Sequence, residues 1–249
     1  MQIAILGDVH GCVRHAATVV GALGVDVAIQ VGDLGAYPSI DALPDGDRAF
    51  VDAYPEQRDV FALVDGELQV DAGAPTYFVS GNHDSRDWLC SLHTIGPVAP
   101  IDPGGAFWHV QCGTTMEVGG RRFGFLGGIE EPAAGHDLDL AAAARLDRVD
   151  VLITHDGPYG LATWEGRTQG SPKLTRVIDD LQPLLHLHGH YHHRNGPRRY
   201  GRTTSYGLAQ LIPPGRRGRT RTVAEGSVGI VDTASLTFDY VAPERIGAV

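Results

Sequence analysis

The chain has 249 residues, 43% of them hydrophobic, which suits one α/β domain with a sizeable buried core rather than two small domains. Its 20 basic and 30 acidic residues give a formal net charge of -10, which argues against a protein that coats nucleic acid through general basicity. We therefore expect a single domain over residues 1–249.

The N-terminus and the cysteines bear on the compartment. Met1 leads directly into the apolar run Gln2–Leu6, without the basic stretch, apolar stretch and cleavage site of a secretory signal. No apolar run approaches the roughly 20 residues needed to cross a bilayer. Cys12, Cys90 and Cys112 are too few and too irregularly spaced for a disulfide framework or a thiolate zinc site. These features predict a soluble, cytoplasmic protein that does not enter a membrane.

Five short apolar or β-favouring runs each lead into Gly, His, Asp or Asn, and we interpret them as buried strands. These runs are Gln2–Leu6, Val27–Val31, Thr76–Val79, Val151–Thr154 and Leu184–Leu187. Candidate helices lie between them, and strands that alternate with helices indicate a mostly parallel sheet. Ligands of such sheets bind beyond the carboxyl ends of the strands, which is where the polar residues fall.

The candidate helices follow the same chain order. Val13–Leu23 follows the first strand, parts of Asp45–Val64 follow the second, and Leu140–Leu146 precedes the fourth. Pro172–Leu181 precedes the fifth strand, with Ser171 as the expected N-cap and proline at the first helical position.

Two stretches contain closely spaced strands instead. The first set is Phe107–Val110, Thr114–Val118 and Arg122–Leu126, separated by Gly-containing turns, and it predicts an antiparallel meander. The second set is Thr203–Leu208, Ser227–Val231 and Leu236–Val241. We therefore expect two sheets packed face to face, with helices outside.

The first two polar strand ends carry carboxylates and an imidazole. Asp8 and His10 are two positions apart, so both side chains can point into one site. Taken alone, such a pair is equally consistent with a ligand site and with a structural hydrogen bond between the two side chains. Asp33 follows the second strand, where a single Asp is more often a helix cap than a ligand.

The other three strand ends contain more residues of the types that bind metal ions. Asn82, His83 and Asp84 offer an amide oxygen, an imidazole and a carboxylate in sequence, which is unusual for a structural turn. Histidines follow the last two strands, and these are His155, His190 and His192. The joint occurrence of such residues at five strand ends favours one shared site, because unrelated structural explanations would have to hold at each end.

These ligand types indicate a reaction. Nitrogen and carboxylate ligands without thiolates suit Mn, Fe or Zn, and a carboxylate such as Asp33 can bridge two ions. Two metal ions roughly 3.5–4 Å apart can hold a bridging hydroxide nucleophile and neutralise the attacking and leaving oxygens of a phosphoryl displacement. The sequence therefore predicts a two-metal enzyme that hydrolyses phosphate esters.

The motifs, taken in order, resemble the calcineurin-like metallophosphoesterase family. That family's pattern of GDxHG, GDxx, GNH[DE], a single His and GHxH stands at residues 7–11, 32–33, 81–84, 155 and 189–192. The resemblance runs from residue 2 to about residue 240. It implies the family's α/β fold, a four-layer αββα sandwich of two mixed sheets flanked by helices.

The resemblance also implies a role for each motif residue. One metal ion would be bound by Asp8, His10, Asp33 and His192, and the other by Asp33, Asn82, His155 and His190. His83 would stabilise the transition state or protonate the leaving group, with Asp84 orienting it.

Departures from the motifs of particular branches of the family indicate to which branch the chain is less similar. Protein Ser/Thr phosphatases carry Asp-Arg-Gly at the second motif, whereas here Leu34–Tyr37 follow the aspartate. Segments that resemble the lariat-debranching branch are Gly81–Arg86, Val98–Pro100, Thr154–Gly160, Gly170–Thr175 and Leu181–Pro183. That branch commonly has Cys in place of Asp8 and a recognition insertion longer than Gly128–Arg148. We therefore treat lariat debranching as an alternative function.

Other residues admit two interpretations. Arg86 either contacts a substrate phosphate or lies at an ordinary surface. His186 and His188 are expected to support neighbouring ligands or to pack. Three tryptophans, Trp88, Trp108 and Trp164, either stack on a base or pack at the core. The basic run Arg216–Arg221 is either a solvated loop or a phosphate-contacting segment.

We expect a phosphodiesterase that acts on a nucleotide or nucleic-acid substrate. The alternatives are an RNA lariat 2′,5′-debranching enzyme, a phosphomonoesterase, and a protein-binding scaffold of the same fold that has lost its metal ligands. The complete ligand set favours an enzyme, because several buried ionisable groups kept together without metal would be costly. The oligomeric state is left open.

Overall fold

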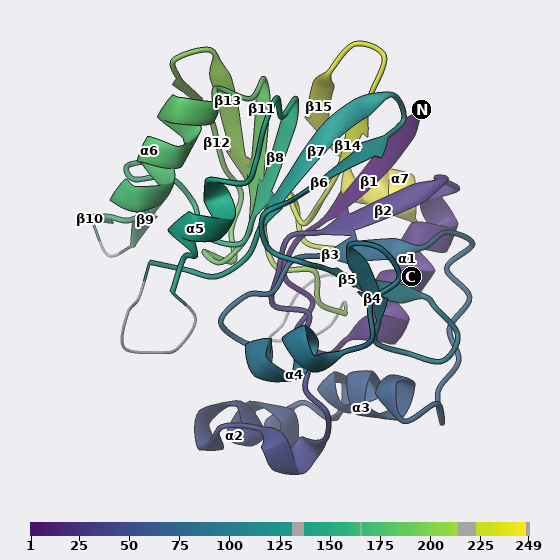
Figure 1. The fold of residues 1–249 in the computed structure, drawn as a ribbon. Helices are drawn as coiled ribbons and strands as arrows, with labels where there is room; N and C mark the ends of the chain where they lie inside the picture. The colour runs from purple at the N-terminus through teal and green to yellow at the C-terminus, as the bar shows by residue number, and fades with distance from the viewer. Residues whose placement is uncertain (131–136, 165, 214–222, 248–249) are drawn as a thin grey trace.

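Two β-sheets lie face to face in the computed structural model, which describes residues 1–130, 137–164, 166–213 and 223–247 (Figure 1). The first sheet has seven strands in the order β15-β14-β1-β2-β3-β5-β4. Its strands are β1 (Gln2–Leu6), β2 (Val27–Gln30), β3 (Thr76–Phe78), β4 (Val98–Pro100), β5 (Phe107–Val110), β14 (Val228–Asp232) and β15 (Thr237–Tyr240). The central strands β1, β2, β3 and β5 are parallel, and β4, β14 and β15 add antiparallel pairs at the edges.

The second sheet has six strands in the order β12-β13-β11-β8-β7-β6. Its strands are β6 (Thr114–Val118), β7 (Arg121–Leu126), β8 (Val151–Thr154), β11 (Leu185–His188), β12 (Asn195–Tyr200) and β13 (Thr203–Gly207). Here β7, β8, β11 and β13 are parallel, and β6 and β12 pair antiparallel at the edges. A separate two-stranded ribbon joins β9 (Thr163–Trp164) to β10 (Arg167–Thr168).

Helices cover the outer faces of both sheets and the loops at the ends of the strands. They are α1 (Val13–Leu23), η1 (Ile40–Ala42), α2 (Asp45–Ala53), η2 (Pro55–Arg58), α3 (Asp59–Val64), α4 (Arg86–Ser91), α5 (Leu140–Ala143), α6 (Pro172–Leu181) and α7 (Pro243–Ile246). In Figure 1, α5 and α6 lie outside the second sheet, while α1 and α7 lie outside the first. Ser171 caps α6 as expected, since its hydroxyl accepts a hydrogen bond from the Leu174 amide at 2.9 Å.

Three buried clusters show how the strands divide their side chains between layers. Ile3 and Ile5 of β1 face the second sheet and pack with residues such as Phe125. The alternate residues Ala4 and Leu6 face the opposite way, into the cluster that contains α1 and α3. A third cluster joins the second sheet to α5 and α6. The expected four-layer αββα sandwich of two mixed sheets flanked by helices is therefore confirmed.

The predicted meander from Phe107 to Gly128 is wrong in its first strand. The strand β5 pairs with β3 and β4 in the first sheet, whereas β6 and β7 form a hairpin in the second. Residues 111–113 thus connect the two sheets. Alternating hydrophobicity identifies a strand, but it does not identify the strand with which it pairs.

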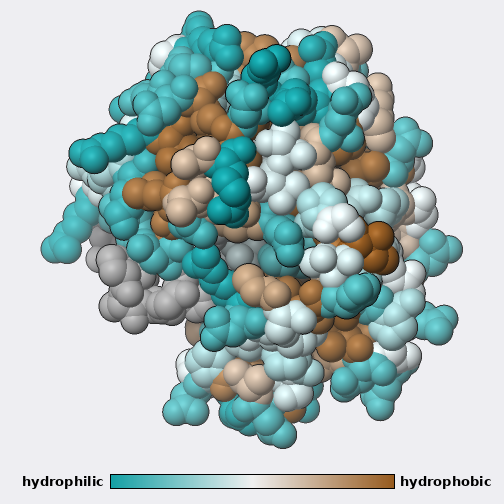
Figure 2. Space-filling view, in the orientation of Figure 1, coloured by the Kyte–Doolittle hydropathy of each residue, from teal (hydrophilic) through white to brown (hydrophobic). Residues whose placement is uncertain are grey.

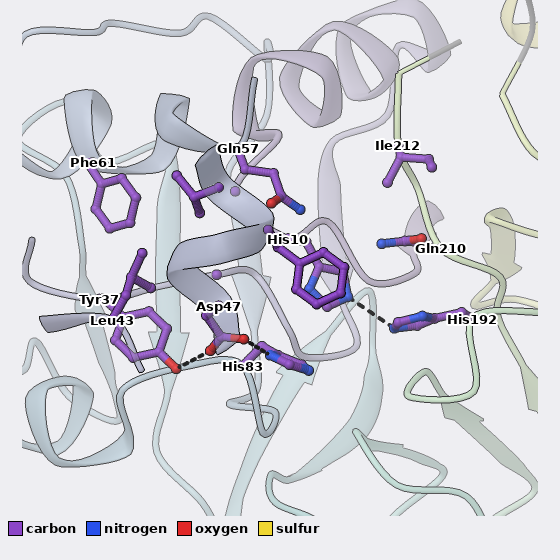
Figure 3. Close-up of a pocket in the computed structure, with 14 residues that line it drawn as sticks. His10, Tyr37, Leu43, Asp47, Gln57, Phe61, His83, His192, Gln210 and Ile212 are labelled. Atoms are coloured by element: carbon purple, nitrogen blue, oxygen red, sulfur yellow. Dashed lines mark hydrogen bonds and ion pairs between the residues drawn. The ribbon is translucent and has the colours of Figure 1, made fainter. Parts of the chain in front are cut away.

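Parallel order in both sheets places the polar strand ends on one side of the molecule. The loops after β1, β2, β3, β8 and β11 meet there, and part of this region lines a cavity beneath α2 (Figure 3). On the face shown in Figure 2, hydrophobic residues form scattered groups among hydrophilic ones. Among the described residues, no helix combines the length and apolar character that crossing a bilayer requires.

Candidate metal centre

Asp33 occupies the centre of the cluster that the strand ends form. Its side chain is 1% exposed, and Oδ1 accepts a hydrogen bond from the backbone N–H of His83 at 2.7 Å. The other oxygen, Oδ2, is buried and has no hydrogen-bond donor in good geometry among the described residues. It lies 3.3 Å from Nε2 of His155 and 3.9 Å from Nε2 of His10. A buried, unsatisfied carboxylate oxygen between two imidazoles is suited to a cation.

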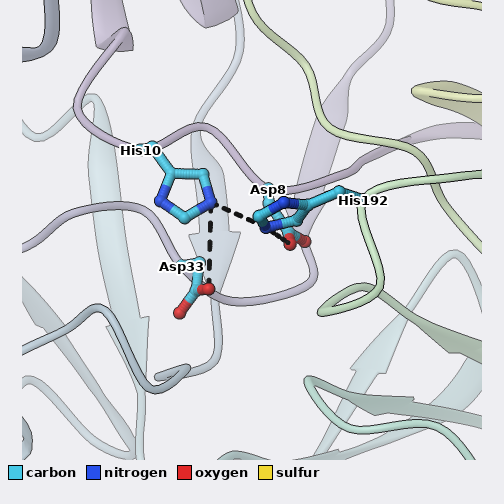
Figure 4. A group of neighbouring side chains, drawn as sticks. All are labelled: Asp8, His10, Asp33 and His192. Carbon is cyan, nitrogen blue, oxygen red and sulfur yellow. Dashed lines mark hydrogen bonds and ion pairs between the residues drawn. The ribbon is translucent and has the colours of Figure 1, made fainter. Parts of the chain in front are cut away.

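The first ligand group contains two carboxylates and two imidazoles. Asp8, His10, Asp33 and His192 each place one ligand atom within 4.8 Å of the others (Figure 4). Nε2 of His10 lies 3.0 Å from Nε2 of His192, and Nε2 of His192 lies 3.2 Å from Oδ2 of Asp8. The ligand atoms of all four side chains are thus close enough to bind one ion.

The second ligand group shares Asp33 with the first. His155 and His190 join Asp33 with their ligand atoms within 4.8 Å of one another. Oδ1 of Asn82 lies 3.1 Å from Nε2 of His155. Nδ1 of His155 donates to the carbonyl of Val31 at 2.9 Å, so Nε2 is the ring nitrogen that faces Asp33 and that a metal ion would bind. This orientation suits a metal ligand.

The backbone at these positions is strained. Four cluster residues have positive φ angles, namely His10 at 45°, Asp33 at 57°, His190 at 70° and His192 at 59°. Such conformations cost energy for residues with a side chain and tend to persist at functional sites. The strand ends therefore turn sharply enough to aim consecutive side chains into one volume.

Two motif glycines provide room for ligands from other strands. A Cβ atom at Gly81 would collide with the Asp33 carboxylate, and one at Gly189 would collide with the Asp8 carboxylate. Both positions thus require a residue without a side chain. In both cases the absence of a side chain makes room for a carboxylate from another loop and is not needed for the glycine's own turn.

Electrostatics at the cluster favour positive charge. Burial lowers the pKa of His155, but the charge and hydrogen bonding of Asp33 outweigh it and raise the pKa to about 10. Burial dominates at His10 and lowers its pKa to about 4. The carboxylates thus favour a positive charge beside His155, which a metal ion would supply in place of the ring proton, whereas His10 is neutral, as a metal ligand must be. The donor set, the shared carboxylate and the charge balance all fit a pair of metal ions.

His83 lies at the edge of this cluster and has a carboxylate partner from α2. Nδ1 of His83 lies 2.7 Å from Oδ1 of Asp47, and the Tyr37 hydroxyl donates to the other Asp47 oxygen at 3.1 Å (Figure 3). Burial lowers the pKa of His83, but the hydrogen bond to Asp47 and the charges of Asp33 and Asp47 raise it to about 9. The imidazole is therefore held in place and protonated at neutral pH.

Comparisons with known proteins agree with this geometry. The family model described as calcineurin-like phosphoesterase matches residues 1–194. The chain belongs to this family. Comparison with curated proteins gave no match.

Solved structures support the fold of this calcineurin-like phosphoesterase. TT1561 of Thermus thermophilus is similar with a TM-score of 0.55 and 16% identity, over 96% of this chain and 97% of that one. The structure described as GAP50, the anchor in the inner membrane complex of Plasmodium, has a TM-score of 0.52 and 12% identity, over 100% of this chain and 86% of that one.

The expectation that Asp84 orients His83 is wrong for this phosphoesterase. The Asp84 carboxylate accepts four backbone N–H groups, those of Asp33, Gly35, Ala36 and Gly81, at 2.7–3.0 Å. Three of these bonds hold the loop after β2 against the loop after β3, and the fourth, from Gly81, lies within the loop after β3. Asp47 contacts the His83 ring instead, and no motif marks it, because it lies in the helix α2 rather than at a strand end.

Arg86 has partners other than a substrate in the described structure. Its guanidinium donates to the Asp137 carbonyl at 3.0 Å and lies 3.6 Å from the Asp139 carboxylate. Both contacts tie α4 of the phosphoesterase to the start of α5. The contact of Arg86 with substrate remains a prediction.

The remaining sequence candidates fall into supporting positions. The His186 ring lies between Thr154 Oγ1 and Ser205 Oγ, at 2.8 and 2.7 Å, and stacks on the His188 ring. Trp88 packs against the core, and the Trp108 indole donates to the Gly105 carbonyl. The three cysteines form no disulfide. The run Arg216–Arg221 and the side chain of Trp164 lie outside the described residues.

Proposed function

We propose that this chain is a metal-dependent phosphodiesterase that acts on a nucleotide or nucleic-acid type of substrate. The observation that carries the proposal is the shared, buried and unsatisfied Oδ2 atom of Asp33 between the two ligand groups. Asp8, His10, Asp33 and His192 would hold one ion, and Asp33, Asn82, His155 and His190 the other.

The chain's own residues define the chemistry around the substrate. Bound metal ions of the Mn, Fe or Zn type would supply a nucleophilic hydroxide at neutral pH and neutralise charge on the phosphoryl oxygens. In the displacement, phosphorus would gain a bond to that hydroxide oxygen and lose its bond to the leaving oxygen. His83 gives the proton on its Nε2 to that leaving oxygen, and Asp47 holds the opposite ring nitrogen.

Cavities on two sides of the ligand cluster favour a diester over a monoester. One, of about 230 Å³, is lined by His10, His83 and His192. The other, of about 390 Å³, is lined by His190, Tyr191 and other mostly polar residues. A phosphate at the cluster would have space for a substituent on either side, which a monoester does not need.

A scaffold function without catalysis is disfavoured by the energetics of the cluster. Asp8, Asp33 and His155 are each no more than 1% exposed. Keeping these groups packed together without a cation leaves their charges and hydrogen-bonding atoms uncompensated, which is unfavourable in a protein interior. A protein that needed only a binding surface would gain nothing from retaining the full set.

The proposal is tested by a substrate panel with Mn-reconstituted protein and a chelated control. The panel contains a chromogenic diester, the corresponding monoester, a short linear oligonucleotide and a 2′,5′-branched RNA. We expect both the chromogenic diester and the linear oligonucleotide to be cleaved faster than the monoester, with the activity lost on chelation. Cleavage of the branched RNA alone would assign lariat debranching, and cleavage of the monoester alone would assign a phosphomonoesterase.

A further inference from the structure

The cavity beneath α2 has a composition that the hydrolytic reaction itself does not require. We propose that it binds the leaving group of the substrate and selects an uncharged aromatic ring of nucleobase size. This inference rests on the proposed phosphodiesterase function and names its substrate class.

The cavity lies on the side of the phosphate from which the leaving group would depart. His83 and Asp47 form part of its wall, together with His10 and His192 from the first ligand group (Figure 3). A group that takes a proton from His83 must have its oxygen beside that imidazole. The rest of that group would therefore extend into the cavity.

Aromatic and aliphatic side chains form most of the remaining lining. They are Tyr37, Leu43, Phe50, Val51, Phe61 and Ile212. The volume of about 230 Å³ lies below the roughly 300–1,000 Å³ typical of pockets for whole drug-sized ligands. A cavity of about 150 Å³ holds benzene in another protein, so this cavity suits a one- or two-ring group.

Two amides give the cavity hydrogen-bonding capacity. Gln57 and Gln210 both line it, and each side chain offers donors and an acceptor. An alkyl chain would leave such amides without partners, whereas the edge of a nucleobase would satisfy them. The amides and the aromatic lining together favour a heteroaromatic ring over a lipid chain.

The charges in the cavity exclude a second phosphate on the leaving group. Among the described lining residues there is no Lys or Arg, and the acidic one, Asp47, is bonded to His83 and Tyr37. The His83 ring is already paired with Asp47, so the described lining offers no Lys or Arg to compensate the charge of a second phosphate. The leaving group is therefore a neutral nucleoside-like unit rather than a nucleotide phosphate.

Substrate pairs that differ only in the ring test the proposal. The parent substrate is a dinucleoside monophosphate with a 5′-oxygen leaving group, and two analogues lack the base on the leaving or on the retained side. We expect removal of the leaving-side base to lower kcat/KM by roughly 5- to 150-fold, the range that base stacking on aromatic side chains provides. Removal of the retained-side base should change kcat/KM less.

Variants of the lining connect that preference to the cavity. Phe50 is 50% exposed, so Phe50→Ala should fold, and Gln210→Leu removes an amide at similar size. Both should reduce the rate ratio between the parent and the leaving-side analogue at least about threefold. Ile95→Ala, at a 60% exposed apolar residue outside the lining, should leave that ratio unchanged.

A binding measurement separates failure of this inference from failure of the proposed function. Saturation-transfer NMR with metal-free protein should detect a free nucleoside, and Phe50→Ala should weaken that signal. Equal cleavage of the parent and the leaving-side analogue would overturn the inference while the phosphodiesterase assignment stands. If no diester is cleaved, the proposed function fails, and absence of nucleoside binding at millimolar concentration would then overturn the cavity assignment as well.

Discussion

Nδ1 of His83 lies 2.7 Å from Oδ1 of Asp47, although the two residues are 36 positions apart and belong to different elements. His83 follows β3 beside the ligand cluster, whereas Asp47 belongs to α2, which also carries Phe50 and Val51 of the cavity wall. The proton donor proposed for the leaving group is thus oriented by the helix that would contact that group.

Replacing Asp47 should impair catalysis without removing metal. We expect Asp47→Ala to lower kcat roughly 10- to 1,000-fold on a diester with a poor leaving group, since the imidazole loses the carboxylate that orients it. A diester with a good leaving group needs little protonation and should be affected far less. Steady-state kinetics on both substrates, with metal content measured in parallel, provides the check.

Asp45→Asn is the matched control, because Asp45 lies in the first turn of the same helix and is exposed. It should behave as the unmodified protein. Equal losses on both substrates in Asp47→Ala would show a general defect of the site rather than a proton-transfer defect.

His83→Ala should retain both metal ions and lose on the order of 10²–10⁴ in turnover, the range typical of a missing general acid or base. Combined with Asp47→Ala, it should cause little further loss, because Asp47 acts through His83. If His83→Ala instead loses metal while turnover per bound metal stays normal, then His83 is a ligand and its assignment as proton donor fails.

Metal stoichiometry should depend on which ligand is removed. We expect two ions per chain in the unmodified protein, full loss of activity on exhaustive chelation, and loss of both ions in Asp33→Ala, because both ligand groups include that carboxylate. His192→Ala should weaken only one ion, since His192 belongs to the first group alone. Elemental analysis after dialysis measures this, and two retained ions in Asp33→Ala would contradict the bridging assignment.

Asp84→Ala should affect stability more than chemistry. The substitution leaves four backbone N–H groups without their acceptor, and hydrogen bonds to a charged group contribute about 1.5–3 kcal/mol each. We expect the free energy of unfolding to fall by at least about 3 kcal/mol in urea titrations. Asp87→Ala, at an exposed position in the first turn of α4, should cost less than about 0.5 kcal/mol.

Acid should destabilise the fold in part through His109. This side chain is 3% exposed, its Nδ1 has no hydrogen-bond partner in the described structure, and burial lowers its pKa to about 4. The unfolded chain therefore binds a proton on this residue at higher pH than the folded one. The stability that the neutral His109 contributes is present above pH about 6.5 and falls as pH drops toward about 4.

His109→Leu should therefore weaken this pH dependence, by up to about 3 kcal/mol between pH 7 and pH 4. Urea titrations of chelated protein remove the contribution of metal release. His93→Leu, at an exposed position, is the control and should keep the dependence of the unmodified protein. Identical pH profiles for both variants would show that His109 titrates normally in the fold.

The local sequence pattern was sufficient to predict most helices and strands. The predicted bounds of β1, β8, α1 and α6 agree with the structure, and β2, β3 and β11 differ by about one residue. Side-chain periodicity and helix-capping residues act over a few positions, so they can be read directly from the chain. The residues of the ligand cluster were found in the same way, because each stands at the end of such a strand.

The pairing of distant strands and the contacts between distant side chains could be assigned only from the tertiary structure. The sequence pattern at β5 could not distinguish the first sheet from the second, because alternating hydrophobicity identifies a strand but not the strand with which it pairs. Asp47 could not be assigned to His83, because only the packing of α2 over the strand ends brings the two together. The same packing sets the size and lining of the cavity. The sequence by itself thus determined most strands, most helices and the residues of the cluster, but not the strands β4, β9, β10 and β12. Long-range packing decided sheet membership, the partner of His83 and the cavity beside it.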